Sequence, residues 1–343
     1  MGSSSSARVS SGDVRRTAQV VSHIRAPSVT PSRVAHMAAG ARASGRDSGA
    51  STRDVHTRVV KAGELDVTYL ECGEGPLALC LHGFPDSPHT WRHLMPELAA
   101  AGYRAVAPFM RGYAPTSVPS SGVYQTAALS RDANALHEAL GGDEKAVIIG
   151  HDWGAPSVCG AAIDAPERWS KVVSMAVPPG PALGAAFLGN LAQVQRSWYM
   201  FFFQHGLSNH VVAANDLAFI DMLWAQWSPG YVASVDLAHV KSSLREAANL
   251  QAALGYYRAT LGDGKRDPEL AELQQRMGGE YPKQPVLYLH GENDGCIGRE
   301  VAEAARAMSP ANVRYEFIAD AGHFMQLEQP ARVNALIVEF LRH

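Results

Sequence analysis

The pentapeptide Gly150-His151-Asp152-Trp153-Gly154 follows the largely apolar run Lys145–Ile149 and precedes the small-residue stretch Ala155–Ala162. A short β-rich run, a Gly-x-nucleophile-x-Gly turn and a helix in this order are the sequence form of a nucleophile elbow. The elbow strains the backbone of its central residue, and flanking glycines let the strand and the helix approach closely. The sequence therefore predicts that Asp152 is a nucleophile presented at the end of a strand.

The central residue of the elbow is Asp, where Ser would indicate an ester hydrolase. A carboxylate attacks sp³ carbon and leaves an ester that must itself be hydrolysed. Epoxides and alkyl halides are the substrates suited to this chemistry. Because Gly-x-Asp-x-Gly arises easily by chance in a chain with 31 glycines, its meaning depends on the motifs around it.

The composition indicates one large domain that acts on a small neutral molecule. A chain of 343 residues with 46% hydrophobic residues can bury the core of an α/β domain with an insertion. The net charge of −3 and the lack of a basic stripe argue against nucleic acid or an anionic membrane surface as a partner. The four cysteines have no metal-ligand spacing, so we expect no metal and no cofactor. No apolar run is long enough to span a bilayer, and we expect a cytoplasmic protein.

The first 53 residues differ from the rest of the chain. They are rich in Ser, Ala and Arg, with few acidic and almost no aromatic residues, and cannot bury a core. We expect a disordered, non-catalytic leader. A transit peptide, an expression leader and an upstream-extended start with Met37 as the alternative initiator all agree with this composition.

From Val55 onward, strand and helix patterns alternate, as in a mostly parallel sheet with helices on both faces. After Pro178-Pro179-Gly180-Pro181 the alternation stops, and the following hundred or so residues read as helices until Pro285–Leu289. We expect residues 54–179 and 285–343 to form the two parts of an α/β core, with a helical cap at 180–284. The expected strands are 56–61, 64–71, 77–81, 104–108, 145–149, 171–177, 286–289 and 313–317, and the expected core helices are 91–101, 126–140, 298–308 and 330–341.

Two polar loops follow the last two expected strands. The first, His290–Gly295, contains Asp294, and the second, Ala319–Phe324, contains His323. The chain order is therefore nucleophile, acid and histidine, which is the order of the hydrolases that use this elbow.

These motifs resemble those of the epoxide hydrolases of the α/β-hydrolase superfamily, over a stretch from Val55 to the C-terminus. The residues that carry the resemblance are His82–Pro85, Gly150–Gly154, Pro166–Arg168, Glu292–Asp294 and Gly322–Phe324. The resemblance implies an α/β-hydrolase fold, with a twisted, mostly parallel sheet and an inserted helical cap.

The same resemblance assigns roles to residues outside the elbow. Two cap tyrosines hold the epoxide oxygen and supply its proton: Tyr199, ahead of Phe203-Gln204, and Tyr257, within Tyr256-Tyr257-Arg258. The backbone N–H groups of Phe84 and Trp153 form the oxyanion hole, and the Phe84-Pro85 bond is expected to be cis.

The substrate pocket is expected to lie beneath the cap and to take a small apolar epoxide. The aromatic stretch Trp198–Gln204 is expected to face inward. The predicted pocket residues are His82, Pro85, Trp153, Trp198 and Phe203. The identity of the epoxide, the selectivity and the oligomeric state stay open, and an oligomer is possible.

The predicted function is conversion of an epoxide to a vicinal diol. In this scheme Asp152 forms an alkyl ester, and His323, oriented by Asp294, activates the water that hydrolyses the ester. A haloalkane dehalogenase would use the same Asp nucleophile, although such enzymes usually carry Asn where this chain has Phe84. A non-catalytic ligand-binding protein of the same fold is the other alternative.

Overall fold

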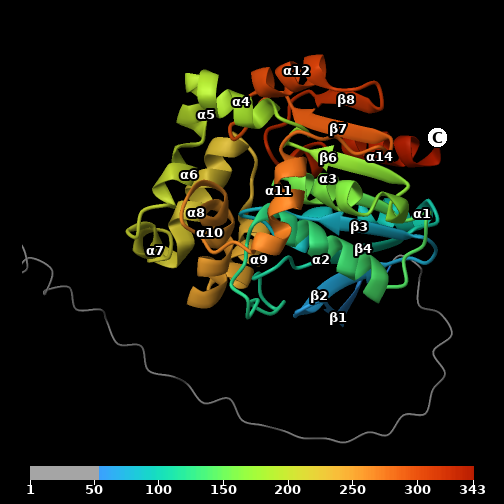
Figure 1. The fold of residues 1–343 in the computed structure, drawn as a ribbon, viewed down its shortest axis with the longest axis horizontal. Helices are drawn as coiled ribbons and strands as arrows, with labels where there is room; N and C mark the ends of the chain where they lie inside the picture. The colour runs from blue at the N-terminus through green and yellow to red at the C-terminus, as the bar shows by residue number, and fades with distance from the viewer. Residues whose placement is uncertain (1–53) are drawn as a thin grey trace, which may run out of the picture. The chain divides into compact units, whose positions relative to one another are not determined.

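The computed structural model describes residues 54–343, and the expected leader at 1–53 lies outside the described residues. Its eight-stranded sheet has the order β1-β2-β4-β3-β5-β6-β7-β8 (Figure 1). The strands are β1 (His56–Ala62), β2 (Leu65–Cys72), β3 (Leu77–Leu81), β4 (Arg104–Pro108), β5 (Val147–His151), β6 (Lys171–Met175), β7 (Val286–Gly291) and β8 (Val313–Ile318).

Only β2 pairs antiparallel with its neighbours, β1 and β4, and every other pair in the sheet is parallel. In the middle of the sheet, Leu79 of β3 lies between Val106 of β4 and Ile148 of β5. The predicted mostly parallel sheet is confirmed. Because the carboxyl ends of its parallel strands share one edge, the loops after β3, β5, β7 and β8 meet there.

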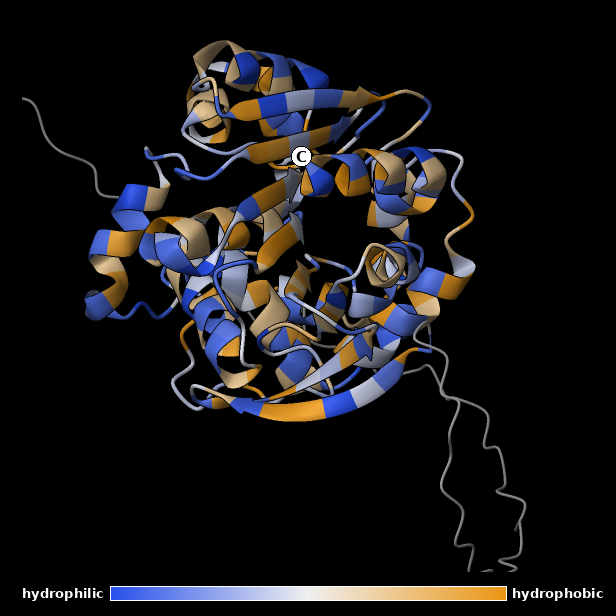
Figure 2. Cartoon of the chain, turned by 90° about the vertical axis from the view of Figure 1, so that its right-hand side faces the viewer, coloured by the Kyte–Doolittle hydropathy of each residue, from blue (hydrophilic) through white to orange (hydrophobic). Residues whose placement is uncertain are grey.

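Alternate residues of the central strands pack into two different hydrophobic cores, one on each face of the sheet. Leu77, Leu79 and Leu81 of β3 belong to one core, and Ala78 and Cys80 belong to the other. Strands buried on both faces read as continuous apolar runs because neither set of side chains meets water. Figure 2 shows the hydrophobic residues concentrated along the inner strands.

Helices cover both faces, as predicted. Residues of α2 and α3 pack into the core of Leu79, and residues of α1 and α14 pack into the core of Ala78. The helices of this part are η1 (Pro88–Trp91), α1 (Met95–Ala100), α2 (Thr126–Ala139), α3 (Gly154–Asp164), η2 (Pro166–Arg168), α12 (Arg299–Met308), α13 (Met325–Glu328) and α14 (Pro330–Arg342).

The helix expected at 91–101 is divided into the short 3₁₀ helix η1 and the later, shorter α1. Pro96 lies in the first turn of α1. Because proline has no N–H to donate, it is tolerated in the first turn of a helix but not in its interior. The regular helix therefore begins at Met95, four residues later than predicted.

Between β6 and β7 the described chain is helical, as the sequence indicated. These helices are α4 (Ala182–Gly189), α5 (Leu191–Arg196), α6 (Trp198–Phe202), α7 (Ser208–Val211), α8 (Ala214–Trp227), α9 (Ser234–Leu244), α10 (Ala247–Leu261), η3 (Pro268–Leu270) and α11 (Ala271–Met277). Most of them gather to one side of the sheet, on the left in Figure 1.

Hydrogen bonds attach this helical segment to the loops at the carboxyl edge of the sheet. Trp224 Nε1 donates to the carbonyl oxygen of Pro85 at 2.7 Å, and the Tyr256 hydroxyl donates to that of Arg111 at 2.6 Å. Over residues 54–343, no helix has the length and apolar character needed to cross a membrane.

Candidate active site

Asp152 occupies the sharp turn between β5 and α3, with a backbone φ of 51°. The glycines on either side have no room for a side chain. A Cβ on Gly150 would lie 2.3 Å from the carbonyl oxygen of Gly154, and one on Gly154 would lie 2.2 Å from that of Leu81. The elbow therefore holds Asp152 in a strained conformation because β3, β5 and α3 are in direct backbone contact.

The buried carboxylate of Asp152 is held through one oxygen. Its Oδ1 accepts a hydrogen bond of 2.7 Å from the backbone N–H of Phe84, at the cis Phe84-Pro85 bond. Its Oδ2 lies 3.5 Å from Nε2 of His323. A Cβ on Gly83 would lie 2.3 Å from Oδ1, so glycine is the only residue that fits beside the carboxylate.

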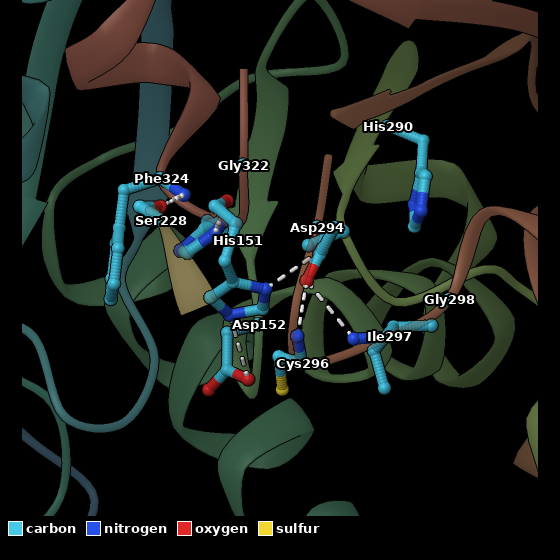
Figure 3. Close-up of polar contacts among 12 residues, drawn as sticks. His151, Asp152, Ser228, His290, Asp294, Cys296, Ile297, Gly298, Gly322 and Phe324 are labelled. Carbon is cyan, nitrogen blue, oxygen red and sulfur yellow. Dashed lines mark hydrogen bonds and ion pairs between the residues drawn. The ribbon is translucent and has the colours of Figure 1, made fainter. Parts of the chain in front are cut away.

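His323 follows β8 and Asp294 follows β7, and the two side chains form a buried ion pair. His323 Nδ1 lies 2.9 Å from Asp294 Oδ2. The other oxygen of Asp294 accepts hydrogen bonds from the backbone N–H groups of Cys296 at 2.7 Å and Ile297 at 3.0 Å (Figure 3). Asp294 thus fixes the imidazole so that Nε2 points toward Asp152.

Charges near His323 decide its protonation. Burial disfavours the imidazolium, but the carboxylates of Asp294 and Asp152 outweigh this effect and raise the pKa of His323 to about 10. Burial likewise opposes the charge on Asp294, and His323 outweighs it and lowers the pKa of Asp294. At neutral pH, the site with an ionised Asp152 therefore holds His323 in its protonated form.

Hydrogen bonds that the sequence did not reveal hold the backbone of the loop that carries His323. His151 Nε2 lies 2.9 Å from the carbonyl oxygen of His323. The carbonyl oxygen of Trp227, at the end of α8, accepts from the N–H groups of both His323, at 3.0 Å, and Gly295, at 3.1 Å. The helical segment between β6 and β7 therefore supports the loops that carry Asp294 and His323.

Both predicted tyrosines reach the same region from that segment. Tyr199 on α6 and Tyr257 on α10 are buried, with ring centroids 5.7 Å apart. The Tyr199 hydroxyl lies 3.3 Å from Sγ of Cys296, and the Tyr257 hydroxyl has no hydrogen-bond partner within residues 54–343. Burial, with smaller effects of neighbours that include Asp152, raises the pKa of each tyrosine well above its usual value. Both hydroxyls therefore keep their protons at neutral pH and are able to donate a hydrogen bond.

A cavity of about 320 Å³ opens between the elbow and the helical segment. Asp152, Trp153, Tyr199 and Tyr257 all line it. Trp153 Nε1 is buried and, within the described part of the chain, makes no hydrogen bond. The other lining residues are mainly apolar and include Val177, Leu183, Phe187, Met200, Leu261, Met277 and Ile297. Such a mixture of apolar walls and a few convergent polar groups is typical of sites for small molecules.

Four of the five predicted pocket residues do not line this cavity, and Trp153 alone of that group does. Trp198 is 40% exposed and contacts Phe202 and Phe219 on the outer side of α6. The expectation that the aromatic stretch faces inward holds for Tyr199 and Phe203, which lie one helical turn apart. Trp198 points outward because each residue of a helix turns the side-chain direction by about 100°.

The remaining three act behind the cavity wall. His82 Nε2 accepts from the N–H of Met110 at 3.1 Å, and burial lowers the pKa of His82 to about 4, so that it is a neutral structural group. Pro85 accepts the hydrogen bond from Trp224, and Phe203 packs edge-on against Tyr257 at 5.0 Å.

The structure adds Cys296, which sequence reasoning did not single out, to the site. Its sulfur lies beside the Asp152 carboxylate in Figure 3. Ligand-capable atoms of Asp152, Cys296 and His323 all lie within 4.8 Å of one another, a group that could hold a metal ion. The only feature of the sequence that points to Cys296 is its position two residues after Asp294. The loop that contains both residues turns back toward Asp152.

Comparison with known proteins agrees with this geometry. The family model described as alpha/beta hydrolase fold matches residues 76–330. The chain therefore belongs to the α/β-hydrolase fold family.

Its relatives include the AB hydrolase superfamily protein YfhM of Bacillus subtilis, 30% identical over 273 residues, with 79% of this chain and 91% of that protein covered. A protein named epoxide hydrolase from Caballeronia sordidicola is 30% identical over 302 residues, with 79% and 89% covered. The Bacillus megaterium epoxide hydrolase, solved with an inhibitor, aligns with a TM-score of 0.70 at 25% identity, over 83% of this chain and 100% of that one. The resemblance that the motifs indicated is confirmed.

We expect Gly154→Ala to destabilise the protein because the new methyl group would collide with the backbone of Leu81 at the elbow. Overpacking at such a site costs about 1–3 kcal/mol. Urea unfolding measures the loss, with Gly279→Ala as the matched control because a Cβ there meets open space. Equal free energies of unfolding for the two variants would show that the close elbow contact is not a constraint.

Proposed function

We propose that this protein is an epoxide hydrolase that converts a small apolar epoxide to a vicinal diol through an ester on Asp152. One observation carries the proposal: Asp152, Tyr199 and Tyr257 line the same apolar cavity. A nucleophile and two proton donors facing one apolar space are what ring opening of an uncharged epoxide requires. The relatives named epoxide hydrolase support the same assignment.

In the first step, Asp152 Oδ2 attacks a ring carbon and the C–O bond of the epoxide breaks. Phe84 N–H occupies Oδ1, which leaves Oδ2 as the attacking oxygen. The tyrosines hydrogen-bond the ring oxygen, and one of them gives it a proton as it becomes the alcohol. A positioned general acid contributes typically ~10²–10⁴-fold to such a step. Tyr257 is the donor ready for substrate, since its hydroxyl has no hydrogen-bond partner within residues 54–343.

In the second step, His323 takes a proton from water, which attacks the ester carbonyl of Asp152. The carbonyl oxygen of the ester is Oδ1, and the N–H of Phe84 that already contacts it stabilises the negative charge that develops there. By resemblance, the N–H of Trp153 is the second donor. The bond between Cγ and Oδ2 then breaks, the departing oxygen takes the remaining proton of the attacking water, and the diol leaves the Asp152 carboxylate and a protonated His323 behind.

Ester formation itself converts His323 into a base. Before attack, two carboxylates hold its proton. Alkylation neutralises Asp152 and leaves only Asp294 to stabilise the imidazolium, so the pKa of His323 falls. The imidazole thus loses its proton at the stage of the cycle that needs a base, and this proton replaces the one that the tyrosine gave to the alkoxide.

We propose that residues 180–284 form a cap on a core made of residues 54–179 and 285–343. Support comes from the cavity, whose walls combine the elbow with α4, α6 and α10. The catalytic triad in this proposal is Asp152, Asp294 and His323.

Haloalkane dehalogenation is the second candidate, and one observation favours it. Trp153 lines the cavity, and its buried Nε1, which has no hydrogen-bond partner in the described chain, could donate to a leaving halide. The side chain of Phe84, however, offers no second donor. The tyrosine hydroxyls have no role in releasing a halide, because that ion needs no proton.

We expect turnover of styrene or terpene epoxides to diols, with no halide release from matched alkyl bromides. Tyr199→Phe and Tyr257→Phe should each slow diol formation, and the double variant should lose about 10²–10⁴-fold because no group then protonates the alkoxide. Halide release without diol formation would assign the dehalogenase instead. Inactivity toward both panels would favour a binding protein.

We expect a single turnover in heavy-oxygen water, with enzyme in excess, to give unlabelled diol. Asp152 donates its own oxygen to the product, and the water oxygen stays in the carboxylate. Mass spectrometry measures the heavy-oxygen label in the diol and in the peptide that contains Asp152. Label in the diol from the first turnover would instead mean direct attack of water on the ring.

We expect His323→Gln to be alkylated but not to hydrolyse the ester, because ring opening requires Asp152 and the tyrosines while the second step requires the base. The intact mass should rise by that of one epoxide and stay raised. An unmodified protein that still binds substrate would contradict the two-step scheme.

A further inference from the structure

The sulfur of Cys296 has no role in the proposed epoxide opening. Together with Asp152 and His323, it completes a set of possible metal ligands. Asp152, Cys296 and His323 bring a carboxylate oxygen, a sulfur and an imidazole nitrogen within 4.8 Å of one another. All three side chains are buried, and Nε2 of His323 has no hydrogen-bond partner in the described chain. One oxygen, one nitrogen and one sulfur are the donors that Zn²⁺ and Cd²⁺ take in proteins.

We propose that Asp152, Cys296 and His323 form an inhibitory site for a thiophilic divalent cation, with Zn²⁺ as the representative ion. Binding replaces the thiol proton of Cys296 and any proton on Nε2 of His323, and both protons leave to solvent. No electron is transferred. The bound ion occupies both the nucleophile and the base, so the enzyme stops.

The groups behind each ligand already have the arrangement that metal sites use. A metal-binding histidine normally presents its other ring nitrogen to a carboxylate, as His323 does to Asp294 at 2.9 Å. The remaining oxygen of Asp152 is fixed by the N–H of Phe84 at 2.7 Å. The Tyr199 hydroxyl, 3.3 Å from the sulfur, can donate to the thiolate.

Charge and space also agree with a cation. The carboxylate of Asp152 and a Cys296 thiolate balance the two charges of Zn²⁺, and the Asp294 carboxylate behind His323 adds a further negative charge that favours a cation. Ligand atoms around tetrahedral zinc lie about 3.3–3.6 Å apart, and the site reaches this spacing if the ligands close by roughly 1 Å. Asp152 and Cys296 also line the cavity, so water from the cavity would supply a further ligand.

Cadmium and zinc binding to the full chain, without substrate, tests the site and does not depend on the proposed reaction. We expect Cd²⁺ to produce the ultraviolet charge-transfer band of a cadmium thiolate. Isothermal titration with Zn²⁺ in chelator-free buffer should show one tight site. Loss of an outer-shell partner of a metal costs 10–100-fold in affinity, so loss of a ligand in Cys296→Ser or His323→Gln should cost at least about 100-fold.

Cys159 supplies the matched control because it lines the same cavity but is not part of the three-residue cluster. In Cys159→Ser, both the cadmium band and the zinc affinity should stay as in the unchanged protein. The proposal would be overturned if the cadmium band persists in Cys296→Ser. It would also be overturned if Cys296→Ser and His323→Gln bind zinc as tightly as the unchanged chain does. Equal losses in Cys159→Ser and Cys296→Ser would also overturn it. His323→Gln, which retains the thiol, decides the matter if Cys296→Ser does not fold.

Discussion

The contact between the backbone of Gly154 and the carbonyl of Leu81 is the constraint on which the site depends. It brings the start of α3 against the end of β3, so that Asp152, at a φ of 51°, stands beside the loop that begins at His82. Only there can Phe84 N–H reach Oδ1 at 2.7 Å. A side chain on either elbow glycine would push α3 away from the strands and move Asp152 away from the N–H of Phe84.

The helical segment depends on the same edge of the sheet. Its side chains donate hydrogen bonds to carbonyl oxygens of the core loops, such as that of Pro85. In the other direction, the carbonyl oxygen of Trp227 accepts hydrogen bonds from the loops of Asp294 and His323. Movement of these helices therefore displaces Tyr199 and Tyr257 as well as the loops of Asp294 and His323. The geometry links the shape of the cavity to the positions of these side chains, because one set of helices provides both.

The strands, the elbow, Asp294 and His323 could be predicted because each depends on local sequence: apolar runs, two glycines and polar loops after strands. Tyr199 and Tyr257 came from resemblance, since no periodicity identifies a hydroxyl that faces a cavity. Trp198 was placed wrongly because an aromatic stretch does not show which side of a helix is buried. Cys296 was missed because its importance arises from the folding of the Asp294 loop toward Asp152, which only tertiary structure reveals.

The charges of the site also restrict which molecules can enter it. With His323 protonated, two carboxylates and one imidazolium leave one net negative charge in a cavity with apolar walls. Interactions between charges strengthen where water is excluded, so an anionic substrate is repelled there while an uncharged epoxide is not. In the proposed reaction, formation of the ester removes the negative charge of Asp152, and Asp294 is then the remaining carboxylate beside His323. The same net charge that excludes anions attracts cations, and a divalent ion competes for the carboxylate that the reaction needs free.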